Sequence, residues 1–369
     1  MGTPIKEITI KGYKSIRNLE KFKLNPINIL IGANGAGKSN FIDFFRLLHE
    51  IIEQRLQFTI NEKGGADKHL FLGPKITNQL MGQVHLGRNG YTFDLKPTVD
   101  NRFVFFNDEQ TSFDGNYADV QTTLGSGHFE SNLKLAQAEG PNKNIAQYVY
   151  SAIAGWVIYH FHDTSETAAM RRQWTVRDNE RLRSDAANLA SFLWGLKQEH
   201  EPIYQIIRDT VQLVAPFFDD FLLRPQKSNG DEVVELEWRQ KNSDYPFHSS
   251  QLSDGTLRFI ALATALLQPN PPSTILLDEP ELGLHPFALN ILAGLIKQAA
   301  VKTQLIISTQ SADLLDAFLP EDIIVVDRQD GESRFRRLSA EELGDWLTDE
   351  YSLGELWQKN VYGGSPAYE

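Results

Sequence analysis

The residues best suited to chemistry form a glycine-rich segment from Gly32 to Ser39, Gly-Ala-Asn-Gly-Ala-Gly-Lys-Ser, which fits the phosphate-binding pattern G-x-x-x-x-G-K-[ST] at every fixed position. An apolar strand is predicted before it, over residues 27–31, and an apolar stripe at helical spacing follows it to about Glu50. A strand that passes through a glycine loop into a helix directs several backbone N–H groups and the positive helix end to one point. We therefore expect a polyphosphate site, with Lys38 on the β- and γ-phosphates and Ser39 as a Mg²⁺ ligand.

A second predicted strand ends in two acidic side chains. Residues 274–280, Thr-Ile-Leu-Leu-Asp-Glu-Pro, predict a buried strand with Asp278 and Glu279 at its end. Two carboxylates would be costly to bury unpaired, and a metal ion with a nucleotide would account for them. We expect Asp278 to hold Mg²⁺, directly or through water, and Glu279 to orient and deprotonate the attacking water.

Two more segments place polar side chains beside apolar elements. Ser253 and the N–H groups around Gly255 precede an apolar helix expected over residues 259–267, and a helix start is an anion site. One triphosphate does not need two such helix ends, whereas two copies of the chain that meet head to tail do. Gln310 follows a buried strand over residues 304–309, and it could sense the γ-phosphate.

The composition excludes several classes of protein. The 369 residues, 41% of them hydrophobic, are enough for a large core and more than one lobe. Without cysteine, the chain has no disulfide scaffold, thiol nucleophile or Cys-ligated metal. The longest apolar run, residues 259–267, is too short to cross a bilayer, and Lys6, Glu7 and Lys11 stand where a signal peptide needs apolar residues. We therefore expect a soluble cytoplasmic protein with no membrane partner.

The net charge of −12 argues against a generally basic, nucleic-acid-binding surface. Local basic patches leave DNA binding possible, because clustered Arg side chains grip phosphates. Alternatively, these arginines lie on solvated faces or pair with carboxylates. The candidates are Arg171, Arg172, Arg177, Arg181 and Arg183, interleaved with Trp174, and Arg334, Arg336 and Arg337.

The rest of the sequence predicts two kinds of architecture. Alternating apolar residues predict two short strands and a turn within residues 5–24. Short stretches punctuated by glycine predict a β-meander between residues 51 and 147. Helices are expected from about residue 145 to 221, two of them over residues 186–194 and 203–214.

Two other polar groups have open roles. Lys14, Ser15 and Arg17 lie in a turn close in sequence to the glycine loop, where a basic residue either touches the nucleotide or belongs to a surface turn. His160 and His162 alternate, so on a strand they share one face, as a metal-binding pair would. No third ligand is evident, which leaves closure of the nucleotide site or a structural role as the alternatives.

The order of these motifs resembles that of the head domains of ABC-type ATPases and, within them, the SMC, RecF and OLD-nuclease branch. Residues Ile10 to Ile16 are similar to the start of that branch, and Tyr159 to Ser165 and Tyr351 to Trp357 are similar to a bacterial group of stand-alone predicted ATPases of about this length. The resemblance rests on Gly32 to Ser39, Leu252-Ser253-Asp254-Gly255, Leu276-Leu277-Asp278-Glu279-Pro280-Glu281, Leu284-His285-Pro286 and Ser308-Thr309-Gln310-Ser311.

The resemblance implies an α/β fold, namely a P-loop NTPase head of the ABC/SMC type with a β-rich insertion and a helical lobe. It also implies a homodimer or higher oligomer in which ATP and Mg²⁺ lie between the P-loop of one copy and the signature, Ser253 and Gly255, of the other. The expected parts are 1–50 (first part of the head), 51–145 (β-rich insertion), 146–250 (helical lobe), 251–345 (second part of the head) and 346–369 (C-terminal helix and tail). The expected nucleotide-binding residues are Gly32, Ala33, Asn34, Gly35, Ala36, Gly37, Lys38, Ser39, Asn40, Ser253 and Gly255; the metal ligands are Ser39 and Asp278, and the residues of hydrolysis are Glu279 and Gln310.

Two departures from the family pattern bear on the mechanism. The signature has Asp254-Gly255-Thr256 where transporter heads have Gly-Gly-Gln, which puts a negative charge near the γ-phosphate unless Asp254 points away. Gln310 stands where many relatives have a switch histidine, which is compatible with slow hydrolysis.

Three classes of function are compatible with these motifs: an ATP-driven dimerising switch that controls a separate effector, a DNA-end or clamp ATPase of the repair type, and a transporter head. The β-rich insertion and the SMC-like start weigh against the transporter, and the DNA clamp requires the arginines near Arg171 to face the dimer groove. Only 59 residues follow Gln310, too few for the C-terminal nuclease domain of OLD-type proteins. We expect the first class, with a partner protein as effector or nuclease and a role in anti-phage defence or DNA maintenance.

Overall fold

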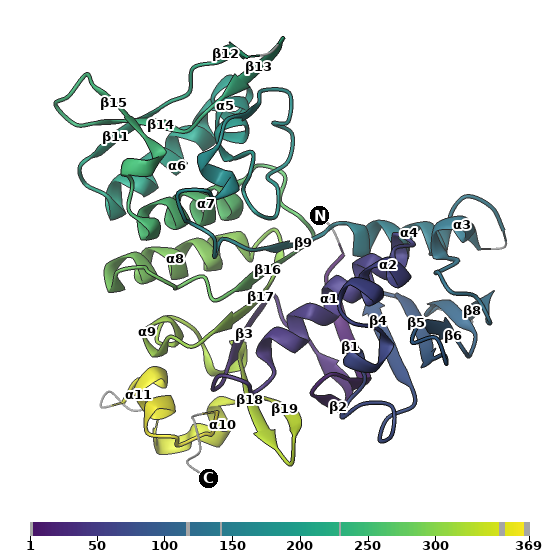
Figure 1. Ribbon diagram of the computed structural model, residues 1–369. Coiled ribbons are helices and arrows are strands. Elements are labelled where there is room, and N and C mark those ends of the chain that lie inside the picture. Colours follow the sequence, from purple (N-terminus) through teal and green to yellow (C-terminus); the bar gives the residue numbers. More distant parts are fainter. Residues whose placement is uncertain (1–2, 116–118, 141, 229, 347–350, 365–369) are drawn as a thin grey trace.

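The computed structural model describes residues 3–115, 119–140, 142–228, 230–346 and 351–364. Helix α1 (Lys38–Ile52) lies between two β-sheets, and a second group of helices covers the far face of one of them (Figure 1). This is the mixed α/β architecture expected from the sequence. Within the described ranges, no helix is both long and apolar enough to span a bilayer.

A six-stranded sheet carries the candidate chemistry. Its order is β19-β18-β3-β17-β16-β9, and only β19 runs antiparallel to its neighbour. The register aligns Leu30 with Ser308 and Ser308 with Asp278, so β3, β17 and β16 end together, where open α/β sheets bind ligands. The strands are β3 (Ile27–Ile31), β9 (Trp156–Tyr159), β16 (Thr274–Asp278), β17 (Gln304–Thr309), β18 (Ile323–Gln329) and β19 (Glu332–Arg337).

Side chains of this sheet alternate between two cores. In β17, Leu305 and Ile307 belong to the first core and Ile306 to the second, and all three are fully buried. Strands buried on both faces read as continuous apolar runs, which explains why β3, β16 and β17 were recognisable in the sequence.

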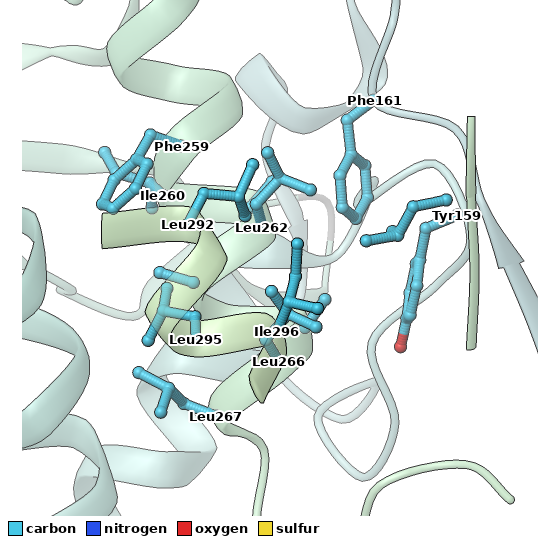
Figure 2. Close-up of a cluster of buried hydrophobic side chains, with 14 of the residues drawn as sticks. Tyr159, Phe161, Phe259, Ile260, Leu262, Leu266, Leu267, Leu292, Leu295 and Ile296 are labelled. Atoms are coloured by element: carbon cyan, nitrogen blue, oxygen red, sulfur yellow. The ribbon is translucent and has the colours of Figure 1, made fainter. Parts of the chain in front are cut away.

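The first core packs helices against one face of the sheet. Figure 2 shows Phe259, Leu262 and Leu266 of α7 close to Leu292 and Ile296 of α8. Helix α7 packs against α6 and α8, and α8 against α9. Fully burying one such aliphatic side chain contributes about 1.5–3 kcal/mol. The helices on this face are α5 (Leu189–Glu199), α6 (Glu201–Val214), α7 (Asp254–Leu267), α8 (Pro286–Ala299) and α9 (Ala312–Leu315).

The second core joins α1 to a seven-stranded antiparallel sheet with the path β2-β1-β4-β5-β7-β8, in which β6 pairs with β5. Phe44 of α1 packs edge-to-face on Tyr13 and stacks on Phe93. Strand β1 pairs with both β2 and β4, so this sheet extends across residue 50, and the division expected there stays a prediction. The strands are β1 (Ile5–Tyr13), β2 (Ile16–Lys23), β4 (Leu80–Leu86), β5 (Asn89–Pro97), β6 (Phe103–Phe105), β7 (Glu109–Phe113) and β8 (Val120–Gly125).

Along the chain, helices precede β4 and follow β8. The β-meander expected from residue 51 begins only at β4, because Leu56 and Ile60 lie one helical turn apart and are both buried. The helices are α2 (Leu56–Glu62), the 3-10 helix η1 (Ala66–His69), α3 (Leu133–Ala136) and α4 (Lys143–Ala154).

The lobe that contains α5 and α6 also has two small three-stranded sheets. The helix expected over residues 186–194 begins at Leu189 instead, because Ala186 has a left-handed φ of 55°. The helix expected over residues 203–214 is present as α6. The strands are β10 (Trp174–Thr175), β11 (Phe218–Leu222), β12 (Gln226–Ser228), β13 (Asp231–Val234), β14 (Glu237–Gln240) and β15 (Pro246–His248).

Two short helices, α10 (Ala340–Leu343) and α11 (Leu353–Gln358), lie near the C-terminal end of the described chain (Figure 1). Helix α11 packs against α9, and the Gly354 N–H bonds Asp316 Oδ1 at 2.6 Å. Part of the expected C-terminal tail, residues 347–350 and 365–369, lies outside the described residues.

Candidate functional site

The glycine loop connects β3 to α1 as the motif predicts. Gly35 and Gly37 have φ values of 79° and 118°, which side chains disfavour. Gly37 is the N-cap of α1, and no described side chain caps this helix end. The first N–H groups of α1 therefore lack a side-chain acceptor, and the positive helix end favours an anion. Among the expected binding residues, Asn34, Gly35 and Ser39 are exposed, whereas Gly32, Ala36, Gly37 and Lys38 are buried.

Two serine side chains hold this loop from behind. Ser333 Oγ in β19 lies 2.5 Å from the Ala36 carbonyl oxygen and 2.7 Å from Ser15 Oγ. Ser15 Oγ also accepts a hydrogen bond of 2.7 Å from the side-chain amide of Asn40. A Cβ atom at Gly37 would overlap Ser333 Oγ, so this approach requires glycine. The β1–β2 turn and β19 thereby fix the loop.

Lys38 folds back over the loop. Its Nζ donates to the carbonyl oxygens of Gly32 at 2.6 Å and Ala33 at 3.1 Å, and the residue is only 5% exposed. Both acceptors are neutral carbonyl oxygens. Among the described residues, no carboxylate lies within salt-bridge distance of the ammonium group.

Three acidic residues at the end of β16 act on this ammonium group from a distance. Burial lowers the pKa of Lys38, and the charges of Glu279, Glu281 and Asp278 oppose that shift. The two motifs, about 240 residues apart in sequence, therefore lie at the same edge of the sheet, where their charges act on each other.

Ser39 and Asp278 offer the oxygen donors that Mg²⁺ prefers. Ser39 is exposed in the first turn of α1, and Asp278, at the end of β16, accepts a hydrogen bond from the Ser308 hydroxyl. Because Mg²⁺ is commonly bound through one or two carboxylates together with phosphate oxygens, this donor set fits the ion.

Glu279 follows β16 in a strained conformation. Its φ of 43° lies in the left-handed region, which costs a non-glycine residue roughly 1–2 kcal/mol. The Glu279 N–H bonds the Ser308 carbonyl at 2.9 Å, and Gln310 Nε2 donates to Glu279 Oε1. Backbone strain of this kind is common at functional sites. The two residues predicted for hydrolysis thus touch each other.

Ser253 is the N-cap of α7, as expected. Its exposed hydroxyl accepts the Thr256 N–H at 3.1 Å, and Gly255 lies so close to the Gly283 carbonyl that a Cβ atom there would overlap it. Helix α7 belongs to the first core, whereas α1 belongs to the second, on the other face of the sheet (Figure 1). The structure therefore does not unite the signature with the glycine loop within one chain.

Residues 27–316 match the model of a family described as "AAA domain, putative AbiEii toxin, Type IV TA system". The chain belongs to this AAA family. No curated protein matches this AAA chain in sequence.

The fold of this AAA chain is similar to that of SMC head domains. An SMC head bound to the C-winged helix domain of ScpA is 16% identical, with a TM-score of 0.60, over 92% of this chain and 98% of that one. A Pyrococcus furiosus Smc head with an extended coiled coil, bound to the C-terminal domain of ScpA, is 15% identical, with a TM-score of 0.56, over 93% of this chain and 98% of that one. The expected SMC/ABC-like P-loop ATPase fold is confirmed.

In this AAA chain Asp254 of the signature pairs with Arg171. The two form an ion pair of 3.0 Å, and Arg171 also donates to the carbonyl oxygens of Thr164, Ser249 and Leu252. Arg171 is only 7% exposed. The idea that Arg171 belongs to a DNA-binding surface was therefore wrong, because backbone acceptors and one carboxylate occupy its guanidinium group.

The other arginines of the two patches divide into those that have a partner and those that form no ion pair with a described residue. Arg183 pairs with Asp178 at 2.5 Å and lies over the Trp174 ring. Arg336 pairs with Glu342 at 2.5 Å, and burial lowers the pKa of Arg337 to about 10. Four further members are exposed and form no ion pair with any described residue: Arg172, Arg177, Arg181 and Arg334.

The two histidines lie beyond the end of β9. The strand ends at Tyr159, but the rings of His160 and His162 stack with centroids 6.5 Å apart. Arg46 Nη2 contacts both ring nitrogens of His160, and Arg46 pairs with Asp43 at 2.6 Å. The described residues contain no group of three metal-binding side chains, so the metal-pair alternative gains no support.

Several residues near the glycine loop were not found from the sequence. One of them is Arg328, which donates to the Gly35 carbonyl at 3.1 Å. Lys14 was considered from the sequence as a nucleotide contact, and the structure pairs it with Asp43. Ser333 is the single small residue of β19, among four charged residues and Phe335, a weak signal that gains meaning only once the strand lies behind Gly37.

Proposed function

We propose that this chain binds ATP with Mg²⁺, hydrolyses it, and uses bound ATP to join two copies head to tail. The AAA family and the SMC-head fold support an ATPase. The observation that carries the proposal is the alignment of β3, β17 and β16, which brings Lys38 and the carboxylates of Asp278, Glu279 and Glu281 to the same edge of the sheet. A buried ammonium group, free helix N–H groups and carboxylates at one point suit a triphosphate with its metal ion.

Each residue has a role in this proposal. Lys38 exchanges its bonds to the loop carbonyls for phosphate oxygens, and the N–H groups of α1 hold the remaining phosphate charge. Ser39 and Asp278 hold Mg²⁺, which supplies charge neutralisation on the phosphates when bound. Glu279 accepts the proton of the attacking water, and Gln310 fixes the Glu279 carboxylate through its side-chain amide.

The second copy supplies the signature. Ser253 and Gly255 begin a 14-residue helix whose N-terminal end is exposed and suits an anion. Leu282 and Phe287, on the segment that packs against Gly255, are 41% and 51% exposed, which suits a surface covered by another copy. We propose that Ser253 and Gly255 of this second copy meet the nucleotide held by Lys38 of the first.

In this proposal the ATP-dependent switch controls a separate effector protein. The SMC heads of similar fold were solved with bound ScpA, and the family description names a toxin system, which supports a partner protein for this chain too. We propose a role in anti-phage defence or DNA maintenance on this basis.

The proposal is tested by titrating Mg·ATP into the wild-type protein and into Lys38→Ala. Loss of a charge-assisted hydrogen bond of about 1.5–3 kcal/mol weakens binding by roughly 10- to 150-fold. Lys68→Ala, an exposed lysine outside the loop, is the matched control and should bind as the wild type does. Equal affinity of Lys38→Ala and the wild type would contradict the proposal.

A further inference from the structure

Glu281 lies in the turn that follows β16, and its carboxyl group is buried against the end of β17. One oxygen, Oε1, accepts two hydrogen bonds of 2.7 Å, from the Thr309 hydroxyl and from the Gln310 backbone N–H. The other oxygen, Oε2, is buried and has no hydrogen-bond partner among the described residues. Burial raises the pKa of Glu281, and the neighbouring charge of Glu279 acts in the same direction.

The two bonds to Oε1 fix the chain at the point where it leaves β17. Gln310 is held at its backbone by Glu281, while its side-chain amide donates to Glu279 Oε1. The Thr309 hydroxyl, which donates to Glu281, also accepts the Ser311 N–H at 3.0 Å, so the backbone is fixed on both sides of Gln310. The contacts therefore run in series from Glu281 through Gln310 to Glu279.

A buried carboxyl group with an unpartnered oxygen is costly for stability alone. An apolar residue in the same turn would avoid that cost, but it would leave the Gln310 N–H without its acceptor. The strained φ of 43° at Glu279 needs surroundings that hold this residue in place. Glu281 supplies such a constraint because it holds the backbone of Gln310, whose side chain in turn holds Glu279.

We propose that Glu281 is a positioning residue of the hydrolytic site, which acts on Glu279 through Gln310. Its carboxyl oxygen sets the position of the Gln310 backbone, and the Gln310 amide then sets the orientation of the Glu279 carboxylate. The inference rests on the proposed ATPase function for its effect on hydrolysis, but the Glu281–Gln310 contact is testable without nucleotide.

The first experiment measures amide hydrogen exchange of the segment 304–316 in the nucleotide-free protein. Glu281→Ala removes the acceptor of the Gln310 N–H and should speed exchange there by about 10-fold or more, since a hydrogen bond to a charged group is lost. Glu281→Gln keeps an acceptor oxygen and should exchange nearly as the wild type does. Exposed Glu62→Ala is the control for a lost acidic side chain.

The second experiment measures ATP hydrolysis by the same variants and by Gln310→Ala. Glu281→Ala should lower kcat by about 10-fold or more, part of the roughly 10²–10⁴-fold that a positioned general base contributes, while the Kd for Mg·ATP changes by less than about threefold. Glu281→Gln should restore most of kcat. The double variant Glu281→Ala/Gln310→Ala should be no slower than Gln310→Ala alone, because the two residues act in series.

The outcomes separate this inference from the proposed function. Unchanged exchange at Gln310 in Glu281→Ala, or fully additive losses of kcat in the double variant, would overturn the inference while leaving the ATPase intact. A wild-type protein that hydrolyses no ATP would overturn the proposed function and the positioning role together, and the exchange data would then assign Glu281 a purely structural contact.

Discussion

Arg171 Nη2 lies 3.0 Å from Asp254 Oδ1, so the acidic residue of the signature is neutralised within its own chain. Arg171 also ties the segment before α7 to the segment after β9 through the carbonyl oxygens of Ser249 and Thr164. Arg171 therefore offsets the negative charge of Asp254 beside Ser253. The pair also explains why a buried arginine is tolerated in this lobe.

Replacing Arg171 by alanine should destabilise the fold. The substitution leaves several buried carbonyl groups without this donor, and each such unsatisfied acceptor costs about 1–3 kcal/mol. Urea unfolding of Arg171→Ala and of Arg172→Ala, an exposed neighbour expected to change stability by less than about 0.5 kcal/mol, measures the difference. Equal unfolding free energies for the two variants would show that the Arg171 contacts do not form.

Two glycines of the loop should respond differently to alanine. At Gly37 a Cβ atom combines a left-handed φ of 118° with overlap on Ser333 Oγ, so about 2–4 kcal/mol of stability should be lost. At Gly35 the nearest atom is 4.0 Å away, and only the backbone strain of roughly 1–2 kcal/mol remains. Thermal or urea unfolding distinguishes them, and a Gly37→Ala protein as stable as Gly35→Ala would contradict the described approach of β19.

Local motifs predicted the glycine loop well. Residues 32–39 combine a turn, a helix start and a preceding apolar strand within a short stretch, and the structure has all three in order. The same holds for β16 and for the N-cap Ser253, because apolar runs and capping residues act over a few positions.

Contacts between distant segments were not predictable in the same way. Ser333 and Ser15 meet Ala36 and Gly37 only because β19 and the β1–β2 turn converge on the loop, and no local pattern encodes that convergence. For Arg171 the sequence left a DNA-binding patch, a solvated face and a carboxylate partner open, since a charge run does not reveal that carbonyl oxygens will surround one member.

The free energy of unfolding should fall as the pH falls from about 6.5 to about 4, in part because of His160. Burial first, and then the Arg46 charge, lower the pKa of His160 to about 4, so the unfolded chain binds a proton that the folded chain refuses. Above the pKa of His160 in the unfolded chain, about 6.5, this group costs no stability. The cost grows as the pH falls toward about 4, the pKa of His160 in the folded chain.

His160→Gln should flatten this pH dependence while keeping an acceptor for Arg46. The urea midpoint measured at several pH values between 4 and 7 reports the slope. His200→Gln, at an exposed histidine, should keep the wild-type slope. A His160→Gln protein with an undiminished slope would mean that His160 is protonated alike in both states.

The measurement that tests the central claim most directly is light scattering of Glu279→Gln with and without Mg·ATP. Glu279→Gln removes the base but leaves Lys38 and the signature in place, so ATP should persist and the mass should rise to twice the 41.8 kDa of one chain. Adding Ser253→Arg to Glu279→Gln should return the mass to that of one chain although ATP still binds. A Glu279→Gln protein that remains a monomer with ATP bound would contradict the head-to-tail arrangement.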